Sequence, residues 1–455
     1  MLKPYNEYKP IPELWITKIP ESWSYRKIKF LFNERSEKGY PNEVLLVASQ
    51  NMGVVPKDVY GNRTVEAQKN LHLLKLVKVG DFVISLRSFQ GGIEYAYYQG
   101  IISPAYTVME PKEEINPGYF RHLAKSRLFI ELLQMCVTGI REGQNIDYSK
   151  LKNHLIPVPP KEEQNQIVRF LDWKLSKINK LIRAKKKQIV LLNEQKQVII
   201  NNAVTKGLDP NVPMKDSGIE WIGQIPIHWN VIRLRGILSP VSIKNHPKLP
   251  LLSVLREKGV IVRDVKDKES NHNFIPDDLS GYKVVQAGQF VMNKMKAWQG
   301  SYGISPYTGI VSPAYFVFDV NVKNKDYFHY SIRSKVYVNF FAQASNGIRV
   351  GQWDLNISKM KDIPFIVPSE EEQTLIIDYI KRTSKDIEVA ITRFSNEIKL
   401  LQEYRTRLIS DVVTGKVDVR DIEIPEYEAD SDETIDDEID DNLVLDEEDG
   451  EMEVE

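Results

Sequence analysis

The chain of 455 residues carries one sequence pattern twice, in the same order, and this repeat restricts the fold more than any other feature. Five blocks of the first half return in the second half at offsets of 206 to 209 residues. A unit of about 200 residues has the size of a domain, whereas solenoid repeats are much shorter, at about 20–45 residues. The sequence therefore predicts a duplicated domain. The matching blocks are Trp15–Trp23 with Trp221–Trp229, Ser103–Tyr106 with Ser312–Tyr315, Gly139–Gln144 with Gly347–Gln352, Glu162–Gln164 with Glu371–Gln373, and Leu191–Glu194 with Leu400–Glu403.

The first part of each copy has the pattern of a mixed α/β domain. Residues 20–158 and 226–367 contain short apolar runs rich in β-branched and aromatic residues, such as Asp81–Ile84, and Gly and Pro separate these runs. That pattern is typical of strands. Apolar residues at near-helical spacing in Pro117–Met135 and Lys325–Ala344 predict a helical stretch in each copy.

The second part of each copy predicts one long helix. Charged stretches without Pro follow Pro160 and Pro368, begin with acidic residues, and run to Gly207 and Gly415. A narrow stripe at heptad a and d positions is apolar at eight of ten places in each stretch. We expect the two helices to pair as an antiparallel coiled coil within the chain; packing of each helix on its own domain is the alternative. The stripe consists of Val168, Leu171, Leu175, Ile178, Ile182, Lys185, Ile189, Leu192, Lys196 and Ile199, and of Ile377, Ile380, Ser384, Ile387, Ile391, Phe394, Ile398, Leu401, Arg405 and Leu408.

The charges are divided unevenly along the chain. The net charge is −1, but residues 421–455 hold 19 acidic and no basic residues, which leaves 61 basic and 43 acidic residues before them, a net charge of +18. An acidic block of this kind predicts a solvated, disordered tail. A strongly basic body is typical of proteins that bind a polyanion, nucleic acid above all, although a soluble protein with excess lysine has the same composition.

Several other classes of protein do not fit the sequence. The single cysteine, Cys136, excludes a disulfide framework, and the seven histidines have no metal-ligand spacing. No apolar run approaches the length of about 20 residues that a transmembrane helix needs, and we expect a soluble cytoplasmic protein. Phosphate-binding and dinucleotide-binding glycine motifs are missing, as is the Asn-Pro-Pro-aromatic motif of adenine methyltransferases. The sequence therefore predicts a non-catalytic protein without metal or cofactor.

The repeated blocks resemble the specificity (S) subunit of type I restriction–modification systems. The resemblance covers nearly all of residues 10–416, and its most specific marks are Asp216–Trp229, the Ser-Pro-Ala-Tyr pair, and Ser149–Gln164. It implies an α/β (mixed α+β) fold with two duplicated target-recognition domains, separated by two long helices that form an antiparallel coiled coil. It also implies the following division: 1–159 first target-recognition domain, 160–207 central helix, 208–368 second target-recognition domain, and 369–416 C-terminal helix. The acidic tail, 417–455, is not part of the family pattern, and we expect it to be disordered.

The resemblance implies a function as well. Each target-recognition domain would read one half of a bipartite duplex DNA sequence, and the paired helices would hold the two domains apart and dock methyltransferase (M) subunits, two of them expected. The M subunits of such systems methylate adenine with S-adenosylmethionine, and restriction (R) subunits use ATP to translocate and cleave DNA. The alternative from the composition is a duplicated adaptor that binds acidic protein partners and no DNA.

Two places in each copy combine cationic and amide side chains with glycines, as contacts to bases and phosphates require. One follows the central predicted strand, and both copies share Gln-Gly there, so a structural turn is the alternative. The other precedes the helical part, and because both copies keep it, we expect it to contact phosphate or to stabilise the fold rather than to read bases. The predicted DNA-binding residues are Arg87, Ser88, Gln90, Lys294, Lys296 and Gln299 at the first place, and Arg141, Gln144, Arg349 and Gln352 at the second.

Overall fold

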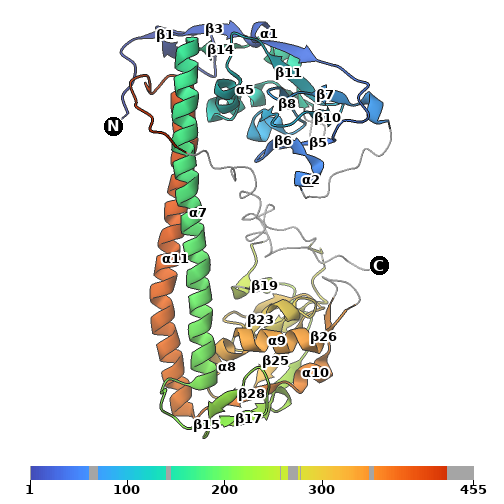
Figure 1. The fold of residues 1–455 in the computed structure, drawn as a ribbon. Helices are drawn as coiled ribbons and strands as arrows, with labels where there is room; N and C mark the ends of the chain where they lie inside the picture. Colours follow the sequence, from blue (N-terminus) through green and yellow to red (C-terminus); the bar gives the residue numbers. More distant parts are fainter. Residues whose placement is uncertain are drawn as a thin grey trace. The chain divides into compact units, whose positions relative to one another are not determined.

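The computed structural model describes residues 2–60, 70–139, 145–256, 258–264, 275–276, 278–347 and 353–427. They form two compact units. Unit 1 contains the described residues up to Lys186 together with those from Ser395 onward, and unit 2 contains the described residues of Lys187–Phe394. The divisions fall inside the two long helices, so each unit combines one α/β domain with a segment of both helices (Figure 1).

A four-stranded antiparallel sheet is the centre of unit 1, with the strand order β4-β11-β8-β9. Successive side chains of β8 point to opposite faces of the sheet, because side chains alternate along a strand. Phe82 packs against Phe120 of the helical face, with ring centroids 4.8 Å apart. Val83 joins the core that the smaller hairpins build on the other face. The strands are β1 (Tyr8–Pro10), β2 (Lys18–Pro20), β3 (Ser24–Lys27), β4 (Phe32–Arg35), β5 (Leu46–Ser49), β6 (Gly53–Pro56), β7 (Lys75–Val77), β8 (Phe82–Ile84), β9 (Glu94–Tyr95), β10 (Gly100–Ile102), β11 (Thr107–Pro111), β12 (Val137–Thr138), β13 (Asn145–Ile146) and β14 (Leu155–Val158).

Unit 2 repeats this architecture strand for strand. Its central sheet has the order β18-β25-β22-β23, and each two-stranded ladder of unit 1 has a counterpart with the same pairing. Phe290 and Met292 of β22 face the helical side, and Val291 faces the hairpin side. The predicted duplication and mixed α/β fold are confirmed. The strands are β15 (Met214–Asp216), β16 (Gln224–Pro226), β17 (Asn230–Arg233), β18 (Leu238–Val241), β19 (Leu252–Leu255), β20 (Gly259–Val262), β21 (Lys283–Val285), β22 (Phe290–Met292), β23 (Tyr302–Ile304), β24 (Gly309–Val311), β25 (Phe316–Val320), β26 (Ser345–Asn346), β27 (Asp354–Leu355) and β28 (Pro364–Val367).

The helical stretch predicted in each domain is a pair of short helices rather than one helix. In unit 1, Ser126 ends the first helix and caps the second, because its side chain accepts a hydrogen bond from the backbone N–H of Phe129. Ser334 occupies the same place in unit 2. The short helices are α1 (Ile28–Leu31), α2 (Lys57–Tyr60), η1 (Leu71–Leu73), α3 (Ser88–Gly91), α4 (Pro117–Ala124), α5 (Arg127–Met135) and α6 (Tyr148–Leu151) in unit 1, and η3 (Leu234–Gly236), η4 (Ala297–Gln299), α8 (Lys325–Ile332), α9 (Lys335–Ala344) and α10 (Ile357–Lys361) in unit 2.

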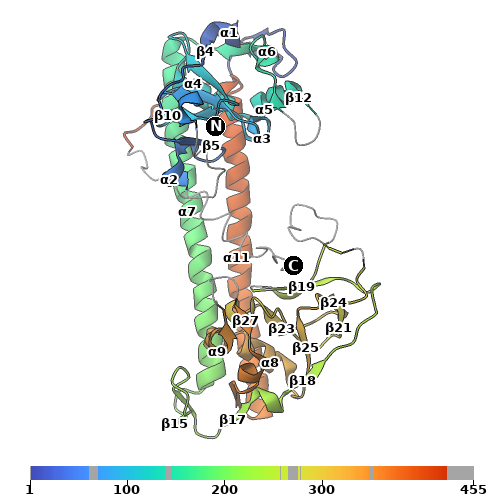
Figure 2. The same ribbon diagram turned by 90° about the vertical axis from the view of Figure 1, so that its right-hand side faces the viewer.

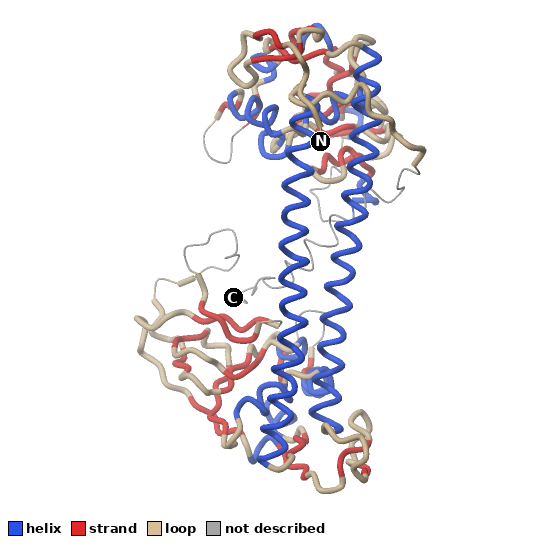
Figure 3. Tube along the Cα trace, turned by 90° about the vertical axis from the view of Figure 1, so that its left-hand side faces the viewer, coloured by secondary structure: helices blue, strands red, loops and turns tan. Residues whose placement is uncertain are grey.

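The two long helices are α7 (Lys161–Lys206) and α11 (Glu370–Val413), and in each unit their segments lie side by side and antiparallel (Figures 2 and 3). All twenty predicted stripe positions are buried or half-buried. The basic residues within the stripe find polar partners on the opposite helix: Lys185 pairs with Glu397 and Arg405 donates to Asn179 (3.1 Å) in unit 1, and Lys196 pairs with Glu388 (2.6 Å) in unit 2. The predicted coiled coil is confirmed.

The ends of the two long helices also pack into the cores of the α/β domains. The alternative expectation, packing of a long helix on a domain, therefore applies at the helix ends. In unit 1, the buried hydroxyl of Tyr119 donates to the carbonyl of Val413 at the end of α11 (2.9 Å). In unit 2, Ala203 and Val204 at the end of α7 lie in the same hydrophobic core as Ile380 near the start of α11. Each domain thus holds the start of one long helix and the end of the other.

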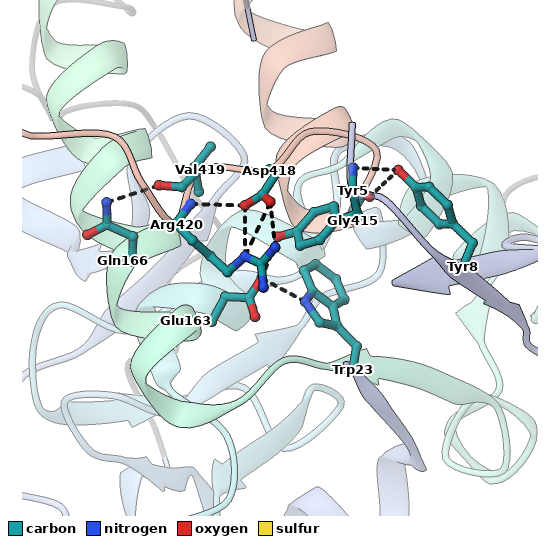
Figure 4. Close-up of polar contacts among 9 residues, drawn as sticks. All are labelled: Tyr5, Tyr8, Trp23, Glu163, Gln166, Gly415, Asp418, Val419 and Arg420. Carbon is teal, nitrogen blue, oxygen red and sulfur yellow. Dashed lines mark hydrogen bonds and ion pairs between the residues drawn. The ribbon is translucent and has the colours of Figure 1, made fainter. Parts of the chain in front are cut away.

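In unit 1, the N-terminal segment lies against the segment that follows α11 (Figure 4), whereas in unit 2 the segment after α7 runs directly into the next domain. Asp418 follows α11 and pairs with Lys3 as an isolated β-bridge, with the N–H of Asp418 donating to the carbonyl of Lys3 (2.8 Å). The carboxylate of Glu163, at the start of α7, accepts hydrogen bonds from the hydroxyl of Tyr5 and from Nε1 of Trp23 (2.9 Å). Gln166 donates to two carbonyls of the segment after α11. These contacts hold the N-terminal segment and the segment after α11 on the first turns of α7.

Candidate nucleic-acid interface

In unit 1, the turn after the central strand β8 presents two of its three predicted residues to solvent. Arg87 precedes the short helix α3 and is exposed, as is Gln90 within it. Ser88 is fully buried, and its hydroxyl accepts a hydrogen bond from the N–H of Ser85 (2.8 Å). Ser88 therefore stabilises the turn, and we do not retain it as a DNA contact.

This turn approaches the end of α4 more closely than a side chain would permit. Gly92 has φ +91°, and a Cβ atom there would lie 2.3 Å from the carbonyl oxygen of Ala124. Glycine is required on both counts, backbone conformation and space. The shared Gln-Gly dipeptides place their glycines at Gly91, where a Cβ atom would lie 2.7 Å from the side chain of Gln50, and at Gly300, which has φ +98°. Both glycines fit the structural turn of the alternative interpretation, while Arg87 and Gln90 are exposed.

In unit 2, the corresponding turn follows β22 and contains Lys294, Lys296 and Gln299, all half-buried. Asn293 shapes the turn: its side-chain oxygen accepts from the N–H of Met295 (3.0 Å), and its amide nitrogen donates to the hydroxyl of Tyr315 (3.1 Å). Lys294 forms an ion pair with Asp354 of β27.

The second predicted place, with Arg141, Gln144, Arg349 and Gln352, lies outside the described residues. The strands that flank it are described. In unit 1, β13 lies against α3, and in unit 2, β27 lies against η4.

An aromatic contact supports the same arrangement in unit 2. Trp353 directly follows the undescribed loop and packs on Trp298 of η4, with ring centroids 5.1 Å apart. In each unit, the structure therefore brings a strand that flanks the second predicted place beside the turn of the first place, and these described residues form one candidate surface.

The hairpin β5–β6 adds residues to this surface that the sequence did not reveal. The side chain of Gln50, in the hairpin turn, donates to the carbonyl of Arg87 (3.2 Å). Lys125, the C-cap residue of α4, forms an ion pair with Glu94 of β9 (2.7 Å). Burial raises the pKa of Glu94 to about 7, although Lys125 opposes this shift by favouring the charged carboxylate. A signal existed: Lys125-Ser126 and Arg333-Ser334 correspond between the copies, but neither dipeptide suggests contacts to residues 30 to 75 positions away.

The described residues contain no group of three or more His, Cys, Asp or Glu side chains that could hold a metal ion. Cys136 is buried, and burial raises the pKa of its thiol to about 11, so the sulfur is not a nucleophile at neutral pH. None of the helices in the described ranges is both long and apolar enough to cross a bilayer.

Known proteins are similar to this chain in sequence and in fold. Residues 20–191 match the type I restriction modification DNA specificity domain. Two chains of Methanocaldococcus jannaschii named as type I restriction enzyme specificity subunits are 24% identical: MjaX over 89% of this chain and 96% of its own, and MjaVIII over 76% and 81%.

The fold comparison covers nearly the whole molecule. A solved chain from work on complex assembly and conformational transition of the type I R-M system aligns with a TM-score of 0.61 at 12% identity, over 88% of this chain and 99% of that chain. The match therefore includes both copies of the repeat and both long helices, in agreement with the duplication seen in the sequence. Residues 20–191 thus match a type I restriction–modification specificity domain, and the chain as a whole is similar in sequence and fold to specificity subunits of such systems.

Proposed function

We propose that this specificity subunit reads a bipartite duplex DNA target, one half with the turn and loop of unit 1 and the other half with those of unit 2. Recognition of DNA sequence through two domains is the role of this family. The observation that carries the proposal is the repeated juxtaposition of a cationic turn with the base of a basic loop, once per domain. Because the copies differ in the side chains they present, the two half-sites need not be alike.

We assign direct base contacts to the exposed or half-buried residues of the turns. Arg and Lys match the acceptors of guanine, and Gln matches adenine in the major groove. Arg87 and Gln90 would serve unit 1, and Lys294, Lys296 and Gln299 would serve unit 2. Arg141, Gln144, Arg349 and Gln352 fit phosphate contact better, since both copies keep the same residues although the two half-sites would differ.

Subunits of this family assemble with M and R subunits and bind DNA. We assign partner docking to the outer faces of the two long helices, where large apolar side chains remain exposed away from the stripe. Such side chains on a charged helix are candidates for a protein interface. They are Leu181, Val190, Leu191 and Val198 on α7, and Leu375, Val389, Leu400 and Tyr404 on α11. In the resulting complex, two M subunits would methylate adenine at N6 and R subunits would supply ATP-dependent cleavage, in the cytoplasm.

We also propose that the helices act as a spacer between the target-recognition domains 1–159 and 208–368, with the tail from residue 417 outside the reading machinery. An uninterrupted helix of 46 residues, such as α7, is about 69 Å long at 1.5 Å per residue. A rigid element of fixed length imposes a fixed number of unread base pairs between the half-sites.

Methylation mapping and competition binding test the proposal together. Cells that carry the chain with its M subunits should show adenine methylation within one bipartite motif, and cells without the chain should lose it. Purified complex should bind that motif in the presence of excess bulk DNA, and its affinity should fall log-linearly with salt concentration as phosphate contacts require. R87Q should weaken the binding of the motif more than R407Q, a matched control on the exposed side of α11. Binding to acidic proteins without preference for any duplex would instead favour the adaptor alternative.

A further inference from the structure

One ammonium group in unit 1 joins three segments of the candidate interface. Nζ of Lys125 donates to the carbonyl of Gln50 in the β5–β6 turn (3.0 Å), to the carbonyl of Gly91 at the end of α3 (3.0 Å), and to Glu94 of β9 (2.7 Å). A lysine ammonium has three N–H donors, and all three are used. We call this set of contacts the Lys125 clamp.

The Lys125 clamp contacts the same turn that carries the proposed base-contacting residues Arg87 and Gln90. Gly91 directly follows Gln90, and the side chain of Gln50 donates to the carbonyl of Arg87 on the same turn. A Cβ atom at Gly91 would lie 2.7 Å from the side chain of Gln50, so the hairpin and the turn are in tight contact. The position of the turn relative to the hairpin therefore depends on Lys125.

Unit 2 contains a matching contact set built from different residues. Arg333, the C-cap residue of α8, donates to the carbonyl of Tyr302 (2.5 Å) and to the carbonyl of Arg256 in the β19–β20 turn (2.7 Å). We call these contacts the Arg333 clamp. Its place in the fold is that of Lys125, because both residues end the first helix of the short pair and both reach the turn of the equivalent hairpin.

The position of the Glu94 carboxylate in the Lys125 clamp is occupied by a glycine in unit 2. Gly303 of β23 stands where Glu94 stands in β9, and a Cβ atom at Gly303 would lie 3.1 Å from the ring of His329. Burial, with Arg333 as a second cause, lowers the pKa of His329 to about 4, so its ring is neutral at pH 7, and Nδ1 accepts a hydrogen bond from the N–H of Ile304 (3.1 Å). The two copies thus keep the cation that reaches the hairpin turn and change the groups around it.

We infer that Lys125 and Arg333 are positioning residues, each of which sets the placement of the reading turn in its own domain and thereby the discrimination of one DNA half-site. This inference rests on the proposed function, since it needs DNA readout at these turns. Neither cation is assigned a contact with DNA. Because every donor of Lys125 already has an acceptor in the protein, its loss should change sequence discrimination without removing a phosphate contact.

The test uses the complete complex with its M subunits and duplexes that carry the mapped target, the target with one substitution in the first half-site, or the target with one substitution in the second. K125M should reduce the discrimination against first-half substitutions by about tenfold or more, comparable to the loss of one good base contact, and leave second-half discrimination unchanged. R333M should do the converse. K125R should restore the wild-type pattern, because arginine serves the same place in unit 2.

The salt dependence of binding separates positioning from direct contact. K125M should keep the wild-type slope of log affinity against log salt, whereas loss of a phosphate contact would lower the slope by about one. A lower slope with intact discrimination, or an equal loss at both half-sites, would overturn the inference. Thermal unfolding of each variant identifies a misfolded protein, and R333M then provides the independent case in the other domain. Failure of the wild-type complex to prefer any duplex would reject the proposed function itself.

Discussion

A buried ion pair in unit 1 has a natural replacement in unit 2, and this comparison yields a quantitative prediction. Arg35 of β4 binds Asp81 with Nε (2.8 Å) and Nη2 (3.3 Å), and their side chains are 4% and 3% exposed. Asp81 also accepts from the N–H of Lys78 (2.8 Å). The strand register places Val241 at the position of Arg35, because Arg35 pairs with Val108 and Val241 with Val317.

In unit 2, a glutamine side chain occupies the place of the Asp81 carboxylate. Gln289 precedes β22 as Asp81 precedes β8, and its side-chain oxygen accepts from the N–H of Gln286 (2.8 Å). Its amide nitrogen donates to Asp319 (2.8 Å), which stands on β25 where Glu110 stands on β11. A Val–Gln pair is therefore compatible with this fold at both positions.

The substitution R35V alone should strongly destabilise unit 1, because it leaves the carboxylate of Asp81 buried without its cation. Loss of one partner of a buried ion pair costs about 3–5 kcal/mol. For a unit of this size we expect a decrease in Tm of roughly 6–20 °C, at about 2–4 °C per kcal/mol. The double variant R35V/D81Q should recover about 2–3 kcal/mol, since it reproduces the arrangement of unit 2 and residues in contact couple by such amounts.

Calorimetry and urea unfolding of the full chain measure these changes. The control R127Q removes an exposed pair with Glu131, whose side chains are 79% and 46% exposed, and should cost under about 0.5 kcal/mol. Burial raises the pKa of Asp81 in the wild-type protein, so the deficit of R35V should shrink as the pH falls and the carboxyl group takes up a proton. The reasoning would be refuted if R35V cost no more than R127Q, or if the double variant were less stable than R35V.

Three further predictions concern pH, the tail and the helices. The pKa of Glu94 is raised from 4.5 to about 7, so the free energy of unfolding of unit 1 should increase as the pH falls from about 7 to 4.5. The variant E94Q should lack this increase when unfolding by urea is measured across the same pH range. An equal increase in the wild-type protein and in E94Q would contradict the prediction. Residues 428–455 include 16 acidic and no basic residues, so they can compete with DNA for the basic surface of the protein. Their removal should tighten non-specific DNA binding at low salt, and an unchanged affinity would show that the tail does not compete. Seven residues inserted after Gln188 and seven after Phe394 should extend the helix pair by about 10 Å. The mapped target should then gain about three unread base pairs at about 3.4 Å each. Binding should be weaker, because three base pairs also rotate one half-site relative to the other by about 100°. An unchanged target would count against a helical spacer.

The sequence predicts most of the architecture, because the repeat and the heptad stripe are both visible as spacing. The stripe positions are buried or half-buried as expected, and even the basic residues Lys196 and Arg405 find polar partners on the opposite helix. The break between α4 and α5 was not predicted, since apolar spacing continues across it while the hydrogen bond that Ser126 makes as a cap decides where the second helix begins.

The candidate site could be predicted only in part. The turn containing Arg87 was found from residue type, but the burial of Ser88 follows from a local hydrogen bond that composition does not reveal. Lys125 was missed because its importance lies in contacts with residues 31 to 75 positions away, which depend on how the hairpin, the turn and the helix meet. Long-range contacts of this kind require the fold to be known.

The contact between the N-terminal segment and the segment after α11 has a consequence for biosynthesis. The described residues of unit 2 form one continuous stretch of chain and can complete their core during translation, whereas unit 1 lacks the end of α11 until unit 2 has been translated. The buried contact between Tyr119 and Val413 spans 294 positions, so unit 1 emerges before unit 2 but is completed after it. During that interval the apolar surface of unit 1 that later packs on α11 is exposed to solvent. The yield of native protein should therefore depend on chaperones and on growth temperature at this stage of synthesis.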